Sequence, residues 1–204
     1  AVKTCIREIK RATTLIEWSD AELTLENCVT TNFDLKISHQ LENDWHRLKP
    51  ATKQLVSDLR QLRTLFHYLL QYDCISFWRL INNIKSMGAS ARNPSLWLLT
   101  PAADRLFRIA KKRIYTIIPS KPTAKNPNPV SRLQPILEVN PKWRLLHQVL
   151  TEIERKSKDR QGGARVLVMV KDERTLESIK SYLIDGSEKA MNKTWLRFLM
   201  HSND

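Results

Sequence analysis

The chain has 204 residues, 42% of them hydrophobic, which is enough to bury a core in one or two small domains. Its formal net charge of +13 fits either a polyanionic partner such as nucleic acid or an ordinary basic surface. No apolar run reaches the ~18 residues of a membrane span. The first residues enter a helical pattern without a signal peptide, so we expect a piece from inside a larger protein. Three cysteines far apart in the sequence show no metal-ligand spacing and indicate a reduced, intracellular protein.

The positive charge lies in the middle of the chain. Residues 51–119 hold eleven basic and three acidic residues, and residues 120–165 hold ten and four. Residues 1–50, with seven basic and eight acidic residues, and residues 166–204, with six of each, are close to neutral. Because binding to a polyanion uses clustered cations, this distribution favours nucleic acid as the partner.

Hydrophobic periodicity predicts helices over most of the first half. An opening helix ends near residues 18–20, and a second covers residues 33–48. The strongest pattern, at residues 51–71, has a buried seam of Leu55, Leu59, Leu62, Phe66 and Leu69. Asp73 is suited to cap a further helix over residues 74–85. The short connections between these helices indicate a compact antiparallel bundle.

The second half is punctuated by turns and prolines. A turn-rich link at residues 88–94 precedes a helix over residues 101–115. Five prolines within residues 119–135 predict a linker or exposed loop, and a domain boundary. A helix over residues 140–156 then begins with proline in its first turn.

The run RVLVMVK at residues 165–171 is typical of a strand buried on both faces of a parallel sheet. Helices over residues 172–183 and 187–200 follow it. The predicted fold class is therefore mainly α, an antiparallel helical bundle followed by a small α/β element. The predicted boundaries are residues 1–118 for the helical domain, 119–135 for the Pro-rich linker and 136–204 for the helix-strand-helix part.

The helix at residues 101–115 is the main candidate for nucleic-acid contact. Its apolar face consists of Ala103, Leu106, Phe107, Ala110 and Ile114. Its cations are Arg105, Arg108 and Lys112 on the opposite side, flanked by Lys111 and Arg113. Such a helix can bridge phosphates without reading bases, although an ordinary solvated face has the same pattern. Arg60 and Arg63, on the polar side of the helix at residues 51–71, are secondary candidates of the same kind.

The residues that ATP hydrolysis or metal catalysis needs are not recognisable. A phosphate-cradling loop needs closely spaced glycines before Lys and Ser or Thr, and no glycine stands in that setting. No histidine has nucleophile or metal spacing with a cysteine. We therefore predict no catalytic residue, no metal ligand and no cofactor.

Three segments resemble XPF-type structure-specific DNA repair endonucleases. The segment KPATKQLVSDLRQLRTLFHYLLQYDC (residues 49–74) is similar to the helical domain in the helicase-like region of the large subunit. The segments ILEVNPKWRLLHQVLTEIE (residues 136–154) and VLVMVKDERTLESIKSYL (residues 166–183) are similar to the start of its second RecA-like domain. The resemblance implies that the α/β element is an incomplete RecA-like domain.

The same resemblance implies a nuclear protein of nucleotide excision repair, interstrand crosslink repair and recombination. It implies partners: branched or junction DNA, a scaffold protein, and a smaller non-catalytic subunit bound through regions outside this chain. It also implies that the ATPase motifs of the helicase-like region are lost. Residues 154–159 (ERKSKD) are one residue too short for the family's nuclease signature, so we expect the solvated end of a helix there and no enzyme activity in this piece.

Two functions remain open at this point. One is non-catalytic DNA binding combined with scaffold docking. The alternative is pure protein docking, in which the bundle offers an apolar groove to an amphipathic segment and makes no DNA contact. Most of the six tryptophans are predicted to be core or helix–helix anchors, and none is predicted to stack on bases; Trp97, beside a turn, is the least constrained by the pattern. The six are Trp18, Trp45, Trp78, Trp97, Trp143 and Trp195.

Overall fold

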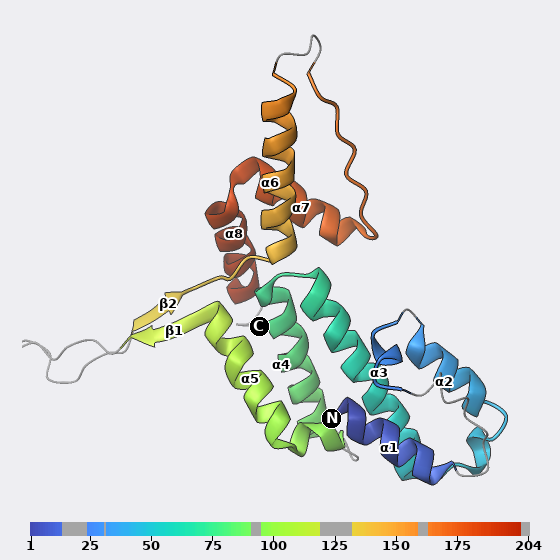
Figure 1. The fold of residues 1–204 in the computed structure, drawn as a ribbon. Helices are drawn as coiled ribbons and strands as arrows, with labels where there is room; N and C mark the ends of the chain where they lie inside the picture. The colour runs from blue at the N-terminus through green and yellow to red at the C-terminus, as the bar shows by residue number, and fades with distance from the viewer. Residues whose placement is uncertain (14–23, 31, 91–94, 119–131, 159–162, 201–204) are drawn as a thin grey trace, which may run out of the picture. The chain divides into compact units, whose positions relative to one another are not determined.

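The computed structural model describes residues 1–13, 24–30, 32–90, 95–118, 132–158 and 163–200. These residues form eight α-helices and one two-stranded sheet (Figure 1), which confirms the mainly α prediction. The helices are α1 (Val2–Ala12), α2 (Phe33–Leu41), α3 (Pro50–Gln71), α4 (Cys74–Ser90), α5 (Pro101–Ile114), α6 (Pro141–Lys156), α7 (Glu173–Asp185) and α8 (Ser187–Met200). Three 3₁₀ turns complete them: η1 (Asn27–Val29), η2 (Trp45–Arg47) and η3 (Leu96–Leu99). No described helix is both long and apolar enough to cross a membrane.

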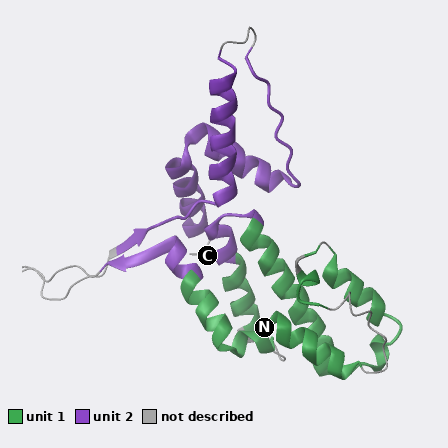
Figure 2. Ribbon diagram, in the orientation of Figure 1, with its two compact units in different colours: residues 1–70, 80–109 green, residues 71–79, 110–204 purple. Residues whose placement is uncertain are grey.

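The chain forms two compact units (Figure 2). Unit 1 consists of residues 1–70 and 80–109, and unit 2 consists of residues 71–79 and 110–204. The predicted division at residues 119–135 stays a prediction, since residues 119–131 lie outside the described part of the chain.

Unit 1 has a core built by α1, α2 and α3. Its fully buried members include Ile9, Phe33, Leu41 and Leu59. Each such side chain stabilises the folded state by about 1.5–3 kcal/mol relative to exposure in water. The predicted seam of α3 holds at Leu59, which is buried, and at Leu55 and Leu62, which are partly buried and pack against the same core. Leu69, at the C-terminal end of the predicted seam, is exposed.

The seam prediction was partly wrong because α3 has neighbours on two sides. Val56 and Leu59 pack into the core with α1 and α2. On another side, Gln61 Oε1 accepts hydrogen bonds of 3.1 Å from both Ser95 Oγ and Trp97 Nε1. Burial on α3 is therefore not confined to the single stripe that the apolar spacing defines.

The second helix of unit 1 ends earlier than predicted. We expected residues 33–48, but α2 ends at Leu41, and a turn leads into η2. The sequence Glu42-Asn43-Asp44 explains the difference, because Asn and Asp favour turns over helix interiors. This early end brings Trp45 into a 3₁₀ turn beside α3.

Unit 2 has its own core around Trp143 of α6, whose ring centroid lies 5.9 Å from that of Tyr182 of α7. The other buried members are Cys74, Ile75, Ile114, Leu137, Ala190 and Met191. Side-chain caps open α4, where Asp73 was the predicted cap, and α6, which begins with proline in its first turn as predicted. Asp73 accepts from Ser76 N at 2.9 Å, and Asn140 accepts from Lys142 N at 3.0 Å.

The sheet is an antiparallel hairpin of β1 (Tyr115–Ile118) and β2 (Arg132–Pro135). Tyr115 faces Pro135, and Ile118 faces Arg132. The last four residues of the predicted linker are thus paired rather than looped out. The helix before the hairpin ends at Ile114, one residue earlier than predicted.

The predicted buried strand at residues 165–171 is wrong. Residues 163–170 have no regular structure, and Leu167 and Met169 are 85% and 84% exposed. A strand needs a hydrogen-bonded neighbour, and the only strands among the described residues, β1 and β2, pair with each other. Without a partner strand, the apolar composition of this run does not bury it.

Candidate nucleic-acid interface

Helix α5 has the two faces that its sequence predicts. On the apolar side, Ala103, Ala110 and Ile114 are buried. On the other side, Arg105 and Arg108 are exposed. The helix is therefore held by its apolar stripe and presents its cations to solvent.

The last turn of α5 adds three more cations: Lys111, Lys112 and Arg113. Lys111 and Lys112 are exposed, and the partial negative charge at a helix C-terminus favours cations at this position. All five cations lie on one continuous helix, Pro101–Ile114.

The five cations of α5 differ in how far they are engaged within the protein. Arg113 forms an ion pair with Glu138, and the Lys111 ammonium lies 5.4 Å from the centroid of the Tyr115 ring. Within the described residues, Arg105, Arg108 and Lys112 have no ion pair with a carboxylate. These three are therefore the most available to an anionic ligand.

The two secondary candidates have partners inside unit 1. Arg60 Nη2 donates to Ser38 Oγ at 2.9 Å, and its Nε lies 4.0 Å from Asp34 Oδ2. Arg63 donates to the backbone carbonyl of Thr30. Both side chains join α3 to the α2 region, and contact with a phosphate requires giving up or sharing these bonds.

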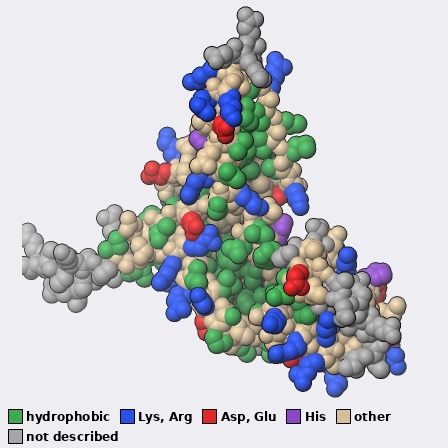
Figure 3. All heavy atoms as spheres, in the orientation of Figure 1, with side chains coloured by type: hydrophobic (Ala, Val, Ile, Leu, Met, Phe, Trp, Pro, Cys, Tyr) green, Lys and Arg blue, Asp and Glu red, His purple; other side chains and the backbone are tan. Residues whose placement is uncertain are grey.

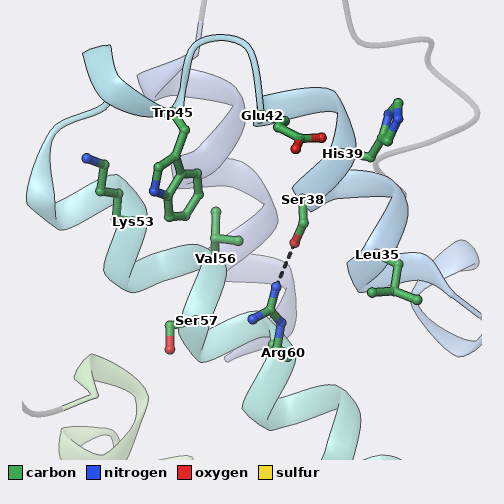
Figure 4. A pocket seen from close by; sticks show the side chains of 9 residues that line it. All are labelled: Leu35, Ser38, His39, Glu42, Trp45, Lys53, Val56, Ser57 and Arg60. Atoms are coloured by element: carbon green, nitrogen blue, oxygen red, sulfur yellow. Dashed lines mark hydrogen bonds between the residues drawn. The ribbon is translucent and has the colours of Figure 1, made fainter.

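A groove about 790 Å³ in volume lies between α2 and α3 in unit 1 (Figure 4). Trp45 stands at its edge with the Lys53 ammonium 5.7 Å from the ring centroid. The Arg60–Ser38 hydrogen bond crosses the groove between the two helices. The lining residues are Leu35, Ser38, His39, Glu42, Trp45, Lys53, Val56, Ser57 and Arg60.

The sequence did not predict this groove, because its apolar spacing indicated that tryptophans such as Trp45 are core or helix–helix anchors. Trp143 is buried as expected, and Trp97, the least constrained by the pattern, is buried too, but Trp45 is 39% exposed. Trp18 lies outside the described residues. The available signal was the basic run around Trp45, since residues 45–53 contain no Asp or Glu.

The cysteines are free thiols, and burial raises the pKa of Cys74 to about 12. Among the described residues, no three His, Cys, Asp or Glu side chains lie close enough together to hold a metal ion. Glu154 and Lys156 form the end of α6, as predicted for the nuclease-like stretch, while Asp159 lies outside the described part.

Basic side chains predominate over acidic ones on the face drawn in Figure 3, in both units. This surface agrees with the charge of the whole chain, which is +13. An excess of exposed cations attracts polyanions over distances up to the screening length of about 8–10 Å.

Known proteins similar to this chain are DNA repair proteins. The DNA repair endonuclease XPF of Mus musculus is 36% identical over 196 residues, covering 90% of this chain and 21% of the mouse protein. The DNA repair protein rad16 of Schizosaccharomyces pombe is 32% identical over 197 residues, covering 89% and 21%. The DNA repair endonuclease UVH1 of Arabidopsis thaliana is 29% identical over 234 residues, covering 96% and 24%. No protein-family model matches the sequence.

The chain belongs to the XPF-type family of DNA repair endonucleases. The chain spans about one fifth of the length of these relatives: the alignments cover 21% of the mouse protein and 21% of the fission-yeast protein.

Proposed function

We propose that this chain is a non-catalytic, DNA-binding and scaffold-docking part of a structure-specific endonuclease subunit. The proposed setting is the nucleus, in nucleotide excision repair, crosslink repair and recombination. The observation that carries the DNA-binding proposal is the cationic side of α5, where Arg105, Arg108 and Lys112 are exposed and have no described carboxylate partner.

The chemistry of this side suits phosphates. Three cations at steps of three and four residues lie about 4.5 and about 6 Å apart along the helix axis, at ~1.5 Å per residue. Contacts of this kind position a protein on the DNA backbone and carry no base sequence. They therefore suit an enzyme that recognises branched or junction DNA by shape. The smaller non-catalytic subunit, in this proposal, binds regions outside this chain.

The test is a fluorescence-anisotropy titration with a labelled splayed-arm DNA at several salt concentrations. The triple variant Arg105→Ala/Arg108→Ala/Lys112→Ala removes the three cations. Each lost duplex phosphate contact flattens the slope of log K against log salt by about 0.9, so we expect a change of about 2–3.

A matched control removes the same charge from unit 2. Lys180, Lys189 and Lys193 are exposed on α7 and α8, and their triple Ala variant should keep the parent's salt slope. Equal loss in both triple variants means that net charge, and not α5, governs binding. Absence of binding by the folded parent at low salt contradicts the DNA-binding proposal.

Pure protein docking is the second candidate, and a different observation favours it. Leu167 and Met169 are 85% and 84% exposed. Val166, which precedes Leu167 in the sequence, lines a hollow of about 400 Å³ together with Leu150, Ile153, Glu154, Ser157, Lys158, Gly163 and Ala164. Exposed apolar clusters of this kind are frequent at protein interfaces. The double variant Leu167→Ser/Met169→Ser separates the candidates. Docking predicts loss of scaffold co-purification with the full endonuclease, and unchanged binding to DNA.

A further inference from the structure

Trp45 differs from the other described tryptophans in its surroundings. Trp97 and Trp143 are buried, and Trp78 and Trp195 pack against the core of unit 2. Trp45 is 39% exposed, because α2 ends at Leu41 and the following turn carries the ring to the edge of the groove (Figure 4). A large exposed aromatic ring costs solvation free energy, which a ligand stacked on it recovers.

The ring stands in a basic environment. The Lys53 ammonium lies 5.7 Å from the centroid of the Trp45 ring. Lys49, which lies between Trp45 and Lys53 in the sequence, is exposed. Arg47 is also exposed, and its 3.6 Å ion pair with Asp44 is a surface pair. Such pairs contribute little to stability, so Arg47 can exchange its partner for a phosphate.

We propose that Trp45 and Lys53 form a stacking site for an unpaired base of single-stranded DNA, with the neighbouring phosphates on Arg47, Lys49 and Lys53. This rests on the proposed DNA-binding function and adds to it a separate contact for the unpaired strand. Single-strand binders combine aromatic rings for the bases with cations for the backbone, and this is the combination present here.

The charges of the groove favour a nucleic acid over a peptide. A peptide helix filling the groove covers the Lys53 ammonium, which has no carboxylate partner among the described residues, and burying such a cation is unfavourable. A single strand of DNA bound at the edge of the groove leaves the Lys53 ammonium and the Arg60 guanidinium hydrated. Glu42 also lines the groove and repels phosphate, which places the strand on the Trp45–Lys53 side rather than across the groove.

The test compares three labelled probes by fluorescence anisotropy on the whole chain. The first is an oligothymidylate of about 16 nucleotides, the upper end of typical site sizes. The second is a duplex of the same length. The third is an oligonucleotide of the same length with abasic sugars, which keeps the phosphates and removes the bases.

We expect Trp45→Ala to weaken oligothymidylate binding by about 5- to 100-fold, as for the loss of one stacked base. Duplex and abasic binding should change less than about twofold, since neither offers an unpaired base. Trp45→Phe should recover part of the affinity because its ring still stacks. Circular dichroism checks the fold of each variant, and the Phe variant keeps the test valid if the Ala variant unfolds.

The outcomes separate this inference from the proposed function. If Trp45→Ala binds oligothymidylate as the parent does, while the α5 triple variant loses DNA, the stacking site is overturned and the function stands. The same holds if Trp45→Ala weakens all three probes equally, since stacking then plays no part. If the parent binds none of the probes, the proposed function and the stacking site both fall, and a protein partner becomes the occupant of the groove.

Discussion

The backbone N–H of Leu96 donates a 3.1 Å hydrogen bond to Oδ2 of Asp58, a carboxylate with no solvent exposure. Gln54 Nε2 supplies a second hydrogen bond, 2.8 Å from Oδ1. A buried carboxylate needs such donors, because burial of an uncompensated charge costs several kcal/mol. Asp58 of α3 therefore fixes the start of η3 in unit 1.

Replacing Asp58 by Ala removes the carboxylate that accepts hydrogen bonds from the Leu96 N–H and from Gln54 Nε2, and leaves both donors without this acceptor. We expect the free energy of unfolding to fall by about 2–4 kcal/mol. Urea denaturation followed by circular dichroism measures it. Glu177→Gln, which alters an exposed carboxylate 4.0 Å from Lys180, is the control and should change stability by less than about 0.5 kcal/mol. Equal stability of Asp58→Ala and the parent contradicts a structural role for the buried carboxylate.

The Cys74 thiol links stability to alkaline pH. The pKa of this thiol is raised from 9.0 to about 12, mainly by burial and further by the Asp73 carboxylate, while Arg113 opposes the rise. Because the folded pKa lies above the unfolded one, the stabilisation is complete below pH 9 and is lost as the pH rises toward 12. Each pH unit in that window costs about 1.4 kcal/mol.

The measurement is the unfolding free energy at about pH 8 and about pH 10, for the parent and for Cys74→Ala. The parent should lose about 1–1.5 kcal/mol more than the variant over this interval, because the variant has no thiol to ionise. Other groups that titrate in this range are common to both proteins and cancel in the comparison. Identical losses mean that the thiol ionises equally in the folded and unfolded states, which contradicts a raised pKa in the folded state.

The sequence predicts local structure well where the signals are local. Helix α8 was expected at residues 187–200 and is found at Ser187–Met200, and Asp73 caps α4 as expected. Helix period, cap residues and turn residues act within a few positions of each other. The two faces of α5 follow for the same reason.

Contacts between distant segments were not predictable in this way. Whether Arg60 faces solvent or Ser38 depends on where α2 lies, and the positions of Trp45 and Gln61 depend on neighbours far along the chain. The expected strand at residues 165–171 failed for a related reason. Apolar composition indicates that a segment is able to be buried, whereas a strand also requires a second strand to pair with.

The partners of Arg60 and Arg63 set an expectation that differs from that for α5. Arg60→Ala/Arg63→Ala loses the contacts to Ser38, Asp34 and the Thr30 carbonyl, so unfolding free energy should fall by about 0.5–2 kcal/mol. Its DNA affinity should fall less than that of Arg105→Ala/Arg108→Ala, which removes the same charge. Urea denaturation and anisotropy titration of both double variants test this. A larger affinity loss in the Arg60 variant makes these two residues the main phosphate contacts.

The exposed apolar run before α7 gives the last expectation. Leu167 and Met169 are 85% and 84% exposed, so their replacement by Lys removes little buried surface and should change unfolding free energy by less than about 0.5 kcal/mol. Exposed apolar segments with unpaired backbone groups promote association between chains. Leu167→Lys/Met169→Lys should therefore lower the apparent mass of concentrated samples in light scattering. The control is Lys189→Ala/Lys193→Ala on α8, which changes two exposed residues without altering the run. A large loss of stability in the Lys variant contradicts the exposure of these side chains, because burying two ammonium groups costs several kcal/mol.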